Sequence, residues 1–383
     1  MDKVDEVLTR GVAEVLPTKD GLKKMMQEKK ITLYQGFDPS MPSLHLGNLV
    51  GVMKLRQFQK LGHKVIFLIG DFSGMIGDPT DKLATRKKLS REEVLVNAKN
   101  WKEQISKLLN FEGDNKAEIK FNSEWLDKVT FKDLIEISSN FTVQQMIERD
   151  MFQKRIQEKE PIYLHEFLYP LAVSIDCVEM DVDLEIGGND QTFNMLAGRT
   201  LMKATKNKDK FVLATKLLVD KEGKKVGKTT GNALFLDSKP SEFFGGIMSF
   251  PDDVIMPGFE LLTEVELSGH VEKIKSDPMG EKKNLAFEIV KLIWGEEDAT
   301  QAKNNFEKTF QEKAPSFETK VQAGDNLAGT IAPFTSMKSV SDAKRYISQK
   351  SVEVNGMVVS DPAYKLKSGD NIKVGAKIFL EVK

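Results

Sequence analysis

Residues 34–48 read YQGFDPSMPSLHLGN, and this stretch decides the fold. The residues just before it, 31–33, are apolar or β-branched and predict a strand. Glycine and proline residues then predict a loop, and His45 begins an apolar pattern at helical spacing that predicts a helix. A strand that leads through a loop into a helix is the first part of a strand–helix–strand unit.

The start of this predicted helix carries His45 and Gly47. Free N–H groups in the first turn of a helix attract phosphate, and glycine lets a flat ring approach the backbone closely. A histidine here can donate a hydrogen bond to a phosphoryl oxygen as negative charge builds up on it. The alternative is that His45 only caps the helix.

Composition narrows the class of protein. The chain has 383 residues and a net charge of -1, so it is long enough for two or three domains and lacks a global basic excess. The single cysteine, Cys177, excludes a disulfide framework and a cysteine-rich zinc site, and the four histidines lack metal-ligand spacing. We find no secretory signal and no stretch that could span a membrane. These features predict a cytosolic (cytoplasmic) protein without a metal centre.

A second apolar strand is predicted at residues 64–69, and it ends in a glycine-rich turn at 70–79. A right-handed crossover brings the carboxyl ends of both strands to one edge, so residues 34–48 and 70–79 are expected to face one crevice. From about residue 316, short alternating segments with an Asn-Gly turn predict a separate small domain. Further strands are predicted at 119–121, 182–186, 211–219, 352–356 and 370–374, and helices over 1–30, 84–110, 123–180 and 240–315.

Residues 224–229 read KKVGKT and form a second basic motif. They are not a nucleotide P-loop, because that motif needs glycine where this chain has Glu222. One interpretation is a solvated charged hairpin. The other is a mobile lysine loop that closes over a polyphosphate and neutralises a departing pyrophosphate.

The two motifs together resemble the two signatures of the class I aminoacyl-tRNA synthetases, and in particular the tyrosyl-tRNA synthetase family. The resemblance extends over residues 34–40, 77–80, 166–176 and 186–191, and the last sixty or so residues resemble an S4-like RNA-binding domain. It implies an α/β fold with a Rossmann-like, doubly wound parallel sheet, then a helical domain and a small α+β domain. The expected boundaries are a catalytic domain at 1–238 with a helical dimerisation insertion around 120–180, a helical anticodon-arm-binding domain at 239–316 and the S4-like domain at 317–383.

The resemblance also implies a role for each matching residue. Stabilisation of the transition state is expected of Ser40, His45, Lys225, Lys228 and Thr229. Tyrosine binding is expected of Tyr34, Asp78, Tyr169, Asp176 and Gln191, with Tyr34 and Asp176 holding the phenolic hydroxyl. ATP binding is expected of Gly36, Asp38, Gly47, Asn48, Gly188, Asp190 and Lys228, and RNA binding of Lys344 and Arg345.

The implied activity is that of a tyrosine–tRNA ligase: tyrosine and ATP form tyrosyl-adenylate and pyrophosphate, and tyrosine is then transferred to tRNA(Tyr). ATP is expected to bind with Mg²⁺, without a tightly bound metal or organic cofactor. The resemblance further implies a homodimer through residues near 120–175 and no membrane partner.

Val173 departs from the family pattern, which usually has glutamine there as a ligand of the tyrosine ammonium. Valine cannot make that hydrogen bond, and Ser174 and Ile175 also differ from the usual residues. Three alternatives therefore stay open: a related enzyme specific for tryptophan, a paralogue that only binds RNA or has another amino-acid specificity, and a nucleotidylyltransferase that does not use tRNA. The pair Tyr34 and Asp176 argues against the first, and the S4-like tail against the third.

Overall fold

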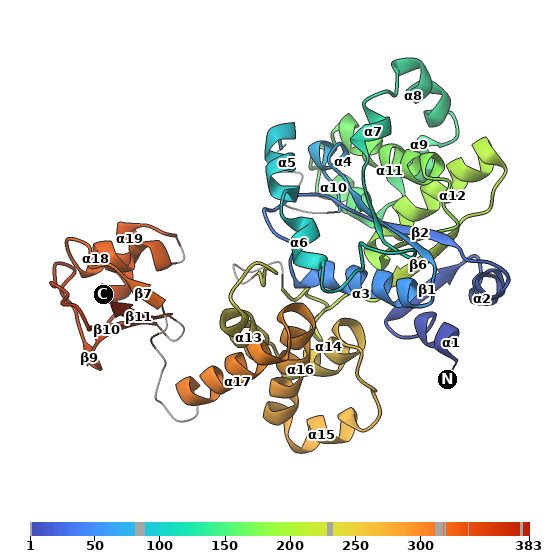
Figure 1. Cartoon of the computed structure of the whole chain (residues 1–383). Coiled ribbons are helices and arrows are strands. Elements are labelled where there is room, and N and C mark those ends of the chain that lie inside the picture. Colours follow the sequence, from blue (N-terminus) through green and yellow to red (C-terminus); the bar gives the residue numbers. More distant parts are fainter. Residues whose placement is uncertain are drawn as a thin grey trace. The chain divides into compact units, whose positions relative to one another are not determined.

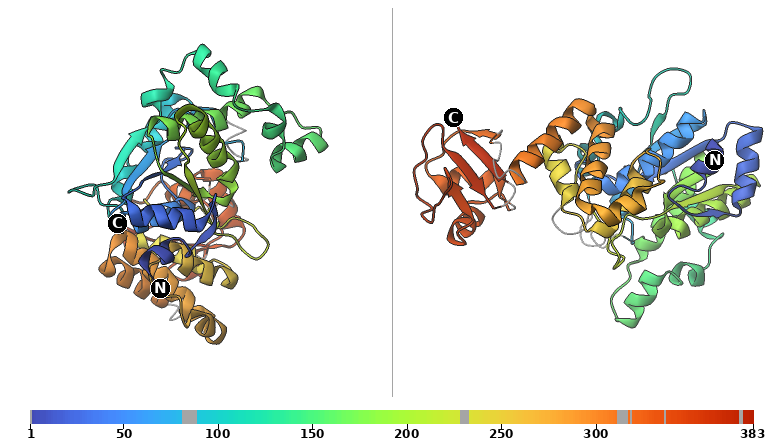
Figure 2. Two further views of the ribbon diagram at one scale, coloured as in Figure 1. Left: turned by 90° about the vertical axis from the view of Figure 1, so that its right-hand side faces the viewer. Right: turned by 90° about the horizontal axis from the view of Figure 1, so that it is seen from below.

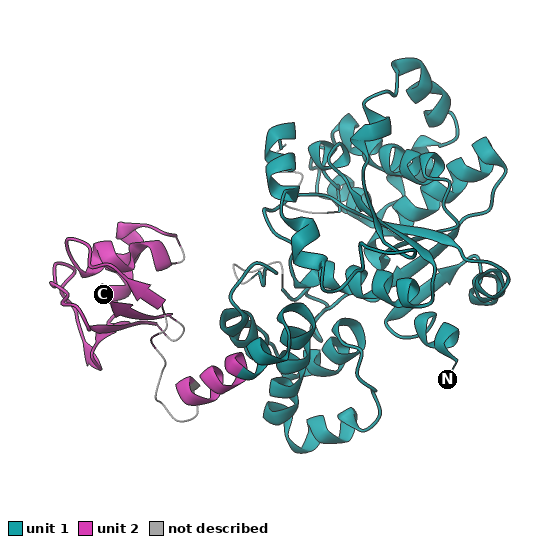
Figure 3. Cartoon of the chain, viewed as in Figure 1, with its two compact units in different colours: residues 1–300 teal, residues 301–383 magenta. Residues whose placement is uncertain are grey.

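The computed structural model describes residues 2–80, 89–227, 233–310, 317, 319–335, 337–375 and 378–383. The chain divides into two compact units, residues 1–300 and 301–383, and each is considered by itself (Figure 3). The division falls within α17 (Glu296–Phe310). The finer boundaries expected at residues 238 and 316 remain predictions.

The first unit is built around a six-stranded sheet in the order β1-β6-β5-β2-β3-β4 (Figure 1). All neighbouring strands are parallel except β1, which runs antiparallel to β6 at one edge. The chain adds β3 and β4 on one side of β2, and β5 and β6 on the other side. The order therefore reverses between β2 and β5, where ligands bind in such sheets, and the predicted doubly wound parallel sheet is confirmed. The strands are β1 (Val12–Leu16), β2 (Thr32–Phe37), β3 (Lys64–Ile69), β4 (Glu118–Phe121), β5 (Leu184–Gly188) and β6 (Phe211–Thr215).

Different helices cover the two faces of the sheet (Figure 1). Successive residues of a strand point to opposite faces. Tyr34 of β2 packs in one cluster with Cys177 of α11 (Leu168–Glu179) and Met202 of α12 (Thr192–Lys206). The next residue, Gln35, lies against Gly51 of α3 (Leu46–Lys60) on the other face. Adjacent residues of β2 thus bring polar atoms to both sides of the sheet.

The helical prediction for residues 1–30 is wrong over Val12–Leu16, which form β1 between α1 (Lys3–Val7) and α2 (Lys19–Glu28). Gly11 has a φ of +65° and separates the first helix from the strand. The pairing of β1 with β6 is distant in sequence, so local periodicity does not reveal it. The strand predicted at 211–219 is also too long, because β6 ends at Thr215, opposite the first residue of β1.

The remaining helices of this unit lie where the sequence predicts helical segments, except α4, which forms a single short helix inside the predicted glycine-rich turn at 70–79. The segment from α8 to α10 projects from the body of the unit (Figure 2). These helices are α4 (Ser73–Ile76), α5 (Arg91–Ala98), α6 (Trp101–Ile105), α7 (Ser123–Leu126), α8 (Phe131–Ser138), α9 (Val143–Ile147), α10 (Asp150–Gln157), α13 (Pro240–Met248), α14 (Ile255–Leu262), α15 (His270–Ser276) and α16 (Pro278–Trp294), with short 3₁₀ turns at Leu164–Phe167, Asn189–Gln191 and Asp252–Val254.

The second unit has a five-stranded sheet in the order β7-β11-β10-β8-β9 with its own apolar core. Asn355 and Gly356 join β8 to β9 with φ values of +49° and +79°, which confirms the predicted Asn-Gly turn. Its elements are β7 (Thr319–Val321), α18 (Leu327–Ile331), a 3₁₀ turn (Ala332–Phe334), α19 (Val340–Ser348), β8 (Val352–Val354), β9 (Met357–Val358), β10 (Asn371–Val374) and β11 (Ile378–Val382).

Candidate active site

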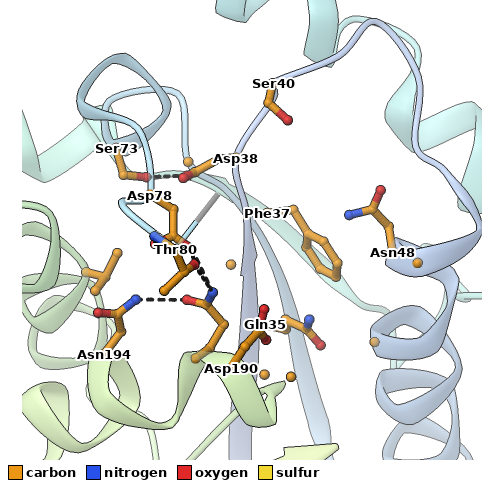
Figure 4. Close-up of a pocket in the computed structure, with 18 of the residues that line it drawn as sticks. Gln35, Phe37, Asp38, Ser40, Asn48, Ser73, Asp78, Thr80, Asp190 and Asn194 are labelled. Atoms are coloured by element: carbon orange, nitrogen blue, oxygen red, sulfur yellow. Dashed lines mark hydrogen bonds between the residues drawn. The ribbon is translucent and has the colours of Figure 1, made fainter. Parts of the chain in front are cut away.

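A cavity of about 1000 Å³ opens at the carboxyl ends of β2, β3 and β5 (Figure 4). Residues from 34–48 and from 70–80 both line it, as the crossover unit predicts. Every predicted tyrosine and ATP ligand within the described residues lines this cavity. So do the predicted transition-state residues Ser40, His45 and Lys225, while Lys228 and Thr229 lie outside the described residues.

His45 both lines the cavity and caps α3. Its Nδ1 accepts hydrogen bonds from the backbone N–H groups of Gly47 (3.0 Å) and Asn48 (3.3 Å), while Asn48 Oδ1 accepts one from the His45 backbone (3.0 Å). A ring nitrogen that accepts carries no proton, so the proton of the neutral ring is on Nε2. The two interpretations of His45, helix cap and phosphate donor, are therefore compatible, because each uses a different ring nitrogen.

The expectation that the first turn of α3 offers free N–H groups to phosphate is wrong. The N–H groups of Gly47 and Asn48 are bonded to His45, and the N–H of Leu46 donates to the carbonyl of Leu234 (2.9 Å). The cap therefore occupies two of these donors, and the bridge to Leu234 occupies the third. Phosphate recognition at this helix therefore has to come from the imidazole rather than from the backbone.

One end of the cavity is suited to a hydroxyl group. Asp176 accepts hydrogen bonds from Trp125 Nε1 (2.8 Å) and Asn122 Nδ2 (3.3 Å), and its burial raises the pKa of this carboxyl well above the usual value in spite of these donors. The buried hydroxyl of Tyr34 makes no hydrogen bond of normal geometry among the described residues, and burial, together with the nearby Glu185 carboxylate, raises its pKa. A buried polar atom without a partner is costly, so a ligand hydroxyl is the natural partner here.

A buried ion pair lies next to Tyr34. Glu185 stands opposite Tyr34 in the parallel register of β5 and β2, and this residue lines the cavity. Lys210 has no exposed surface, and its ammonium group bonds the Glu185 carboxylate and the carbonyl of Met195 (3.0 Å). Sequence reasoning missed the pair. The signal was a glutamate in the apolar run of a strand that is covered on both faces.

Asp38 links α11 to α4 through hydrogen bonds. One carboxylate oxygen accepts the hydroxyl of Tyr169 (2.8 Å) and the other accepts the hydroxyl of Ser73 (2.6 Å; Figure 4). Asn122 donates to Ser73 Oγ (2.9 Å) as well as to Asp176. These bonds link the two ends of the cavity through one polar network, and Asn122 and Ser73 are members that the sequence alone did not identify.

Asp78 lies at the end of a chain of amide side chains (Figure 4). Gln191 Nε2 donates to Asp78 Oδ2 (2.7 Å) and to Thr80 Oγ1 (3.1 Å), and Thr80 N donates to Asp78 Oδ1 (2.9 Å). Asn194 Nδ2 donates to Gln191 Oε1 (2.8 Å). The cavity wall also includes Val173, so this departure from the family pattern is at the site itself.

The lysine loop meets the site through Lys225, whose Nζ lies 2.6 Å from Asp190 Oδ2. Asp190 follows Gly188 at the end of β5, and both residues line the cavity. A lysine predicted to stabilise the transition state and an aspartate predicted to bind ATP thus form an ion pair.

Gln35 is a further cavity residue that the sequence did not single out. Its Oε1 is buried without a hydrogen-bond partner among the described residues. A Cβ atom on Gly51 would overlap this oxygen, so the amide fits only because position 51 has no side chain. The glycine and the glutamine together shape the α3 side of the cavity.

The predicted RNA-binding residues belong to the second unit. Lys344 and Arg345 are exposed on α19, and Arg345 pairs with Asp342 (2.6 Å). Within the ranges that the structure describes, no group of three His, Cys, Asp or Glu side chains could hold a metal ion. In the same ranges, no helix is long and apolar enough to cross a bilayer.

Two family models match the chain: tRNA synthetases class I (W and Y) over residues 26–311, and the S4 domain over residues 337–372. The chain is 41% identical over 400 residues to a tyrosine–tRNA ligase of Carboxydothermus hydrogenoformans (98% of this chain, 97% of the relative). It is 41% identical over 389 residues to one of Aquifex aeolicus, with the same coverage.

Solved structures share the fold. A C-terminally truncated mitochondrial tyrosyl-tRNA synthetase of Aspergillus nidulans superposes with a TM-score of 0.67 at 23% identity, over 80% of this chain and 94% of that one. A tyrosyl-tRNA synthetase of Archaeoglobus fulgidus complexed with L-tyrosine superposes with a TM-score of 0.61 at 20% identity, over 79% and 99%. The family models and the full-length relatives together establish that this chain belongs to the class I tRNA synthetases, in the group of the tyrosine and tryptophan enzymes.

Proposed function

We propose that this protein is a tyrosine–tRNA ligase, which activates tyrosine with ATP and transfers it to tRNA(Tyr). The observation that supports this proposal most directly is at the polar end of the cavity. There the unpartnered hydroxyl of Tyr34 and the carboxyl of Asp176 are both buried. A substrate with a phenolic hydroxyl gives the Tyr34 hydroxyl a partner and adds a hydrogen bond to Asp176, whereas phenylalanine leaves the Tyr34 hydroxyl unpaired. Rejection of a substrate that lacks a hydroxyl group is already well known for tyrosyl-tRNA synthetases, and we apply the same reasoning to this chain.

The first step needs no protein nucleophile. An oxygen of the tyrosine carboxylate attacks the α-phosphorus of ATP, the bond from this phosphorus to the bridging oxygen breaks, and pyrophosphate leaves with the electron pair. The Nε2–H of His45 is proposed to donate to the phosphoryl group as its charge grows, and Lys225 to neutralise the pyrophosphate. Ser40 is proposed to assist on the same side of the cavity.

The second step transfers the tyrosyl group. A terminal ribose hydroxyl of tRNA attacks the carbonyl carbon of the adenylate, loses its proton and forms an ester, and AMP leaves. The S4 domain match over residues 337–372 supports RNA binding by the second unit, with Lys344 and Arg345 as proposed contacts.

The amino-acid and nucleotide ligands are proposed as the family pattern implies. Asp78, Tyr169 and Gln191 are proposed to bind the amino-acid end of tyrosine. Tyr169 donates its proton to Asp38, so its oxygen can accept from an ammonium group. Gly36, Asp38, Gly47, Asn48, Gly188 and Asp190 are proposed to shape the ATP site, and Mg²⁺ is proposed to enter with ATP as part of that substrate.

A homodimer through the projecting helical segment is also proposed. No residue of α8 is buried, and Phe131 on this helix is 78% exposed. Val143 and Leu164, nearby in sequence, are 68% and 79% exposed. Exposed apolar side chains gathered on one segment are typical of a surface that a partner covers. A cytoplasmic location is proposed on the family alone.

ATP–pyrophosphate exchange measured with a panel of amino acids tests the proposal. We expect exchange with tyrosine and none with phenylalanine or tryptophan, followed by charging of tRNA(Tyr). Exchange that is stimulated by tryptophan would favour the other specificity of the family, and RNA binding without exchange would favour an inactive paralogue.

A further inference from the structure

Asn194 lies on the first turns of α12 and is only 3% exposed, yet its side-chain oxygen has no hydrogen-bond partner among the described residues. The same side chain uses its nitrogen to donate to Gln191 Oε1 (2.8 Å; Figure 4). A half-satisfied buried amide is unusual, because leaving the carbonyl unpaired costs free energy.

The orientation of both amides is forced. A carboxylate only accepts hydrogen bonds, so the Gln191 group that faces Asp78 has to be its NH₂ group. Gln191 Oε1 then points away from Asp78 and needs a donor, which the NH₂ group of Asn194 supplies. Asn194 cannot rotate its amide without placing its own oxygen against that of Gln191.

Packing alone does not explain Asn194. A leucine of similar size would fill the same space and remove the unpaired buried carbonyl. Asn194 itself lines the cavity, and its amide does what an apolar residue cannot do: it holds Gln191 with its NH₂ group on Asp78. Through this bond Asn194 supports the hydrogen bond from Gln191 to the Asp78 carboxylate, which the backbone N–H and the hydroxyl of Thr80 also hold.

We propose that Asn194 is a positioning residue for the α-ammonium group of the substrate amino acid, and that it acts through Gln191 and Asp78. This inference rests on the proposed function. An ammonium group binds a carboxylate that is held in one orientation more tightly than one that has to be ordered on binding. The effect belongs to binding rather than to the chemical step, because the ammonium is held in the same way before and during adenylate formation.

The test compares Asn194→Leu with the unmodified full-length chain in tyrosine-dependent pyrophosphate exchange. We expect the KM for tyrosine to rise about tenfold, kcat to change less than about threefold, and the melting temperature to stay level or rise. The affinity for 3-(4-hydroxyphenyl)propanoate, which lacks the amino group, should not change. Thr200→Leu, at an exposed position of the same helix, is the control and should leave all four quantities unchanged.

Two further variants keep the test decisive. Asn194→Asp retains an oxygen and the size of the side chain but loses the donor, so it should weaken tyrosine binding as Asn194→Leu does. In a Gln191→Ala background, Asn194→Leu should have little additional effect, because the bond through which it acts is absent.

Equal losses for tyrosine and the deaminated ligand, additive effects with Gln191→Ala, or a clear fall in melting temperature would each overturn the proposal and assign Asn194 a packing role. The proposed function is tested separately, by pyrophosphate exchange of the unmodified chain with the panel of amino acids. If that chain activates another amino acid, the same comparison with that amino acid and its deaminated analogue still decides the role of Asn194.

Discussion

Lys225 Nζ lies 2.6 Å from Asp190 Oδ2, so a lysine of the loop forms an ion pair with a proposed ATP ligand. We predict that Lys225→Met lowers the rate of adenylate formation about 100-fold, because a charge that stabilises the leaving pyrophosphate is lost. ATP binding in the ground state should stay the same or tighten, because Asp190 is no longer paired. Single-turnover rates and equilibrium ATP binding measure the two quantities, and weaker ATP binding at an unchanged rate would contradict the prediction.

His45 combines a cap with a proposed catalytic donor, and two variants separate these roles. His45→Ala should lose roughly 1 kcal/mol of stability through the cap and slow adenylate formation by about 3 kcal/mol of activation energy. His45→Asn should keep most of the stability, because asparagine is a good cap, but not the rate. Urea unfolding and single-turnover kinetics check the pair, with tyrosine affinity expected to stay close to that of the unmodified chain.

We predict that tyrosine binds more weakly with Val173 than it would with glutamine at this position. Val173→Gln should lower the KM for tyrosine with little change in kcat, since an added charge-assisted hydrogen bond contributes roughly 1.5–3 kcal/mol. Steady-state exchange kinetics measure both constants. If the variant instead loses activity with its best amino acid, Val173 is apolar lining of a pocket for a different substrate.

The pair formed by Lys210 and Glu185 should be strongly coupled. Lys210→Met leaves a buried carboxylate without its partner, and we expect a loss of roughly 3–5 kcal/mol in the free energy of unfolding. Adding Glu185→Gln should recover part of that loss, because the unpaired charge is removed. Urea denaturation of the two single variants and the double variant gives the coupling, and additive effects would show that the pair contributes little.

His63 makes stability depend on pH. Burial lowers the pKa of His63 to about 4, and its Nδ1 accepts a hydrogen bond from the N–H of Ile31 (3.2 Å). The unfolded chain protonates near pH 6.5. Below that pH it binds a proton that the folded chain resists, so the folded state loses up to roughly 3 kcal/mol as the pH falls from 6.5 to 4. His63→Asn should flatten the stability profile in this window, as chemical denaturation at several pH values can measure.

The parallel sheet and the crevice could be predicted from sequence because the apolar run 64–69 and the punctuated stretch 34–48 carry local signals. β1 could not, since its partner β6 is far away in the chain and its residues are only partly apolar. Lys225 could be assigned to the site from its motif, but its partner Asp190 could not, because their contact depends on tertiary placement.

The polar site residues that could not be identified from the sequence share one property. Asn122 and Trp125 orient Asp176, and Asn194 orients Gln191, so each acts through another side chain. Motif matching finds residues that are expected to touch substrate. The side chains that hold them are scattered over other elements, and only the three-dimensional arrangement identifies them.

The close approach of Gln35 to Gly51 restricts how this pocket can change during evolution. Glycine to alanine inside a helix normally favours the helix by about 1 kcal/mol, but here the new methyl group would overlap the Gln35 amide. The Gln35 amide therefore has to move, or residue 35 has to become smaller, when position 51 gains a side chain. Either change alters the wall of the pocket, so positions 35 and 51 evolve as a coupled pair.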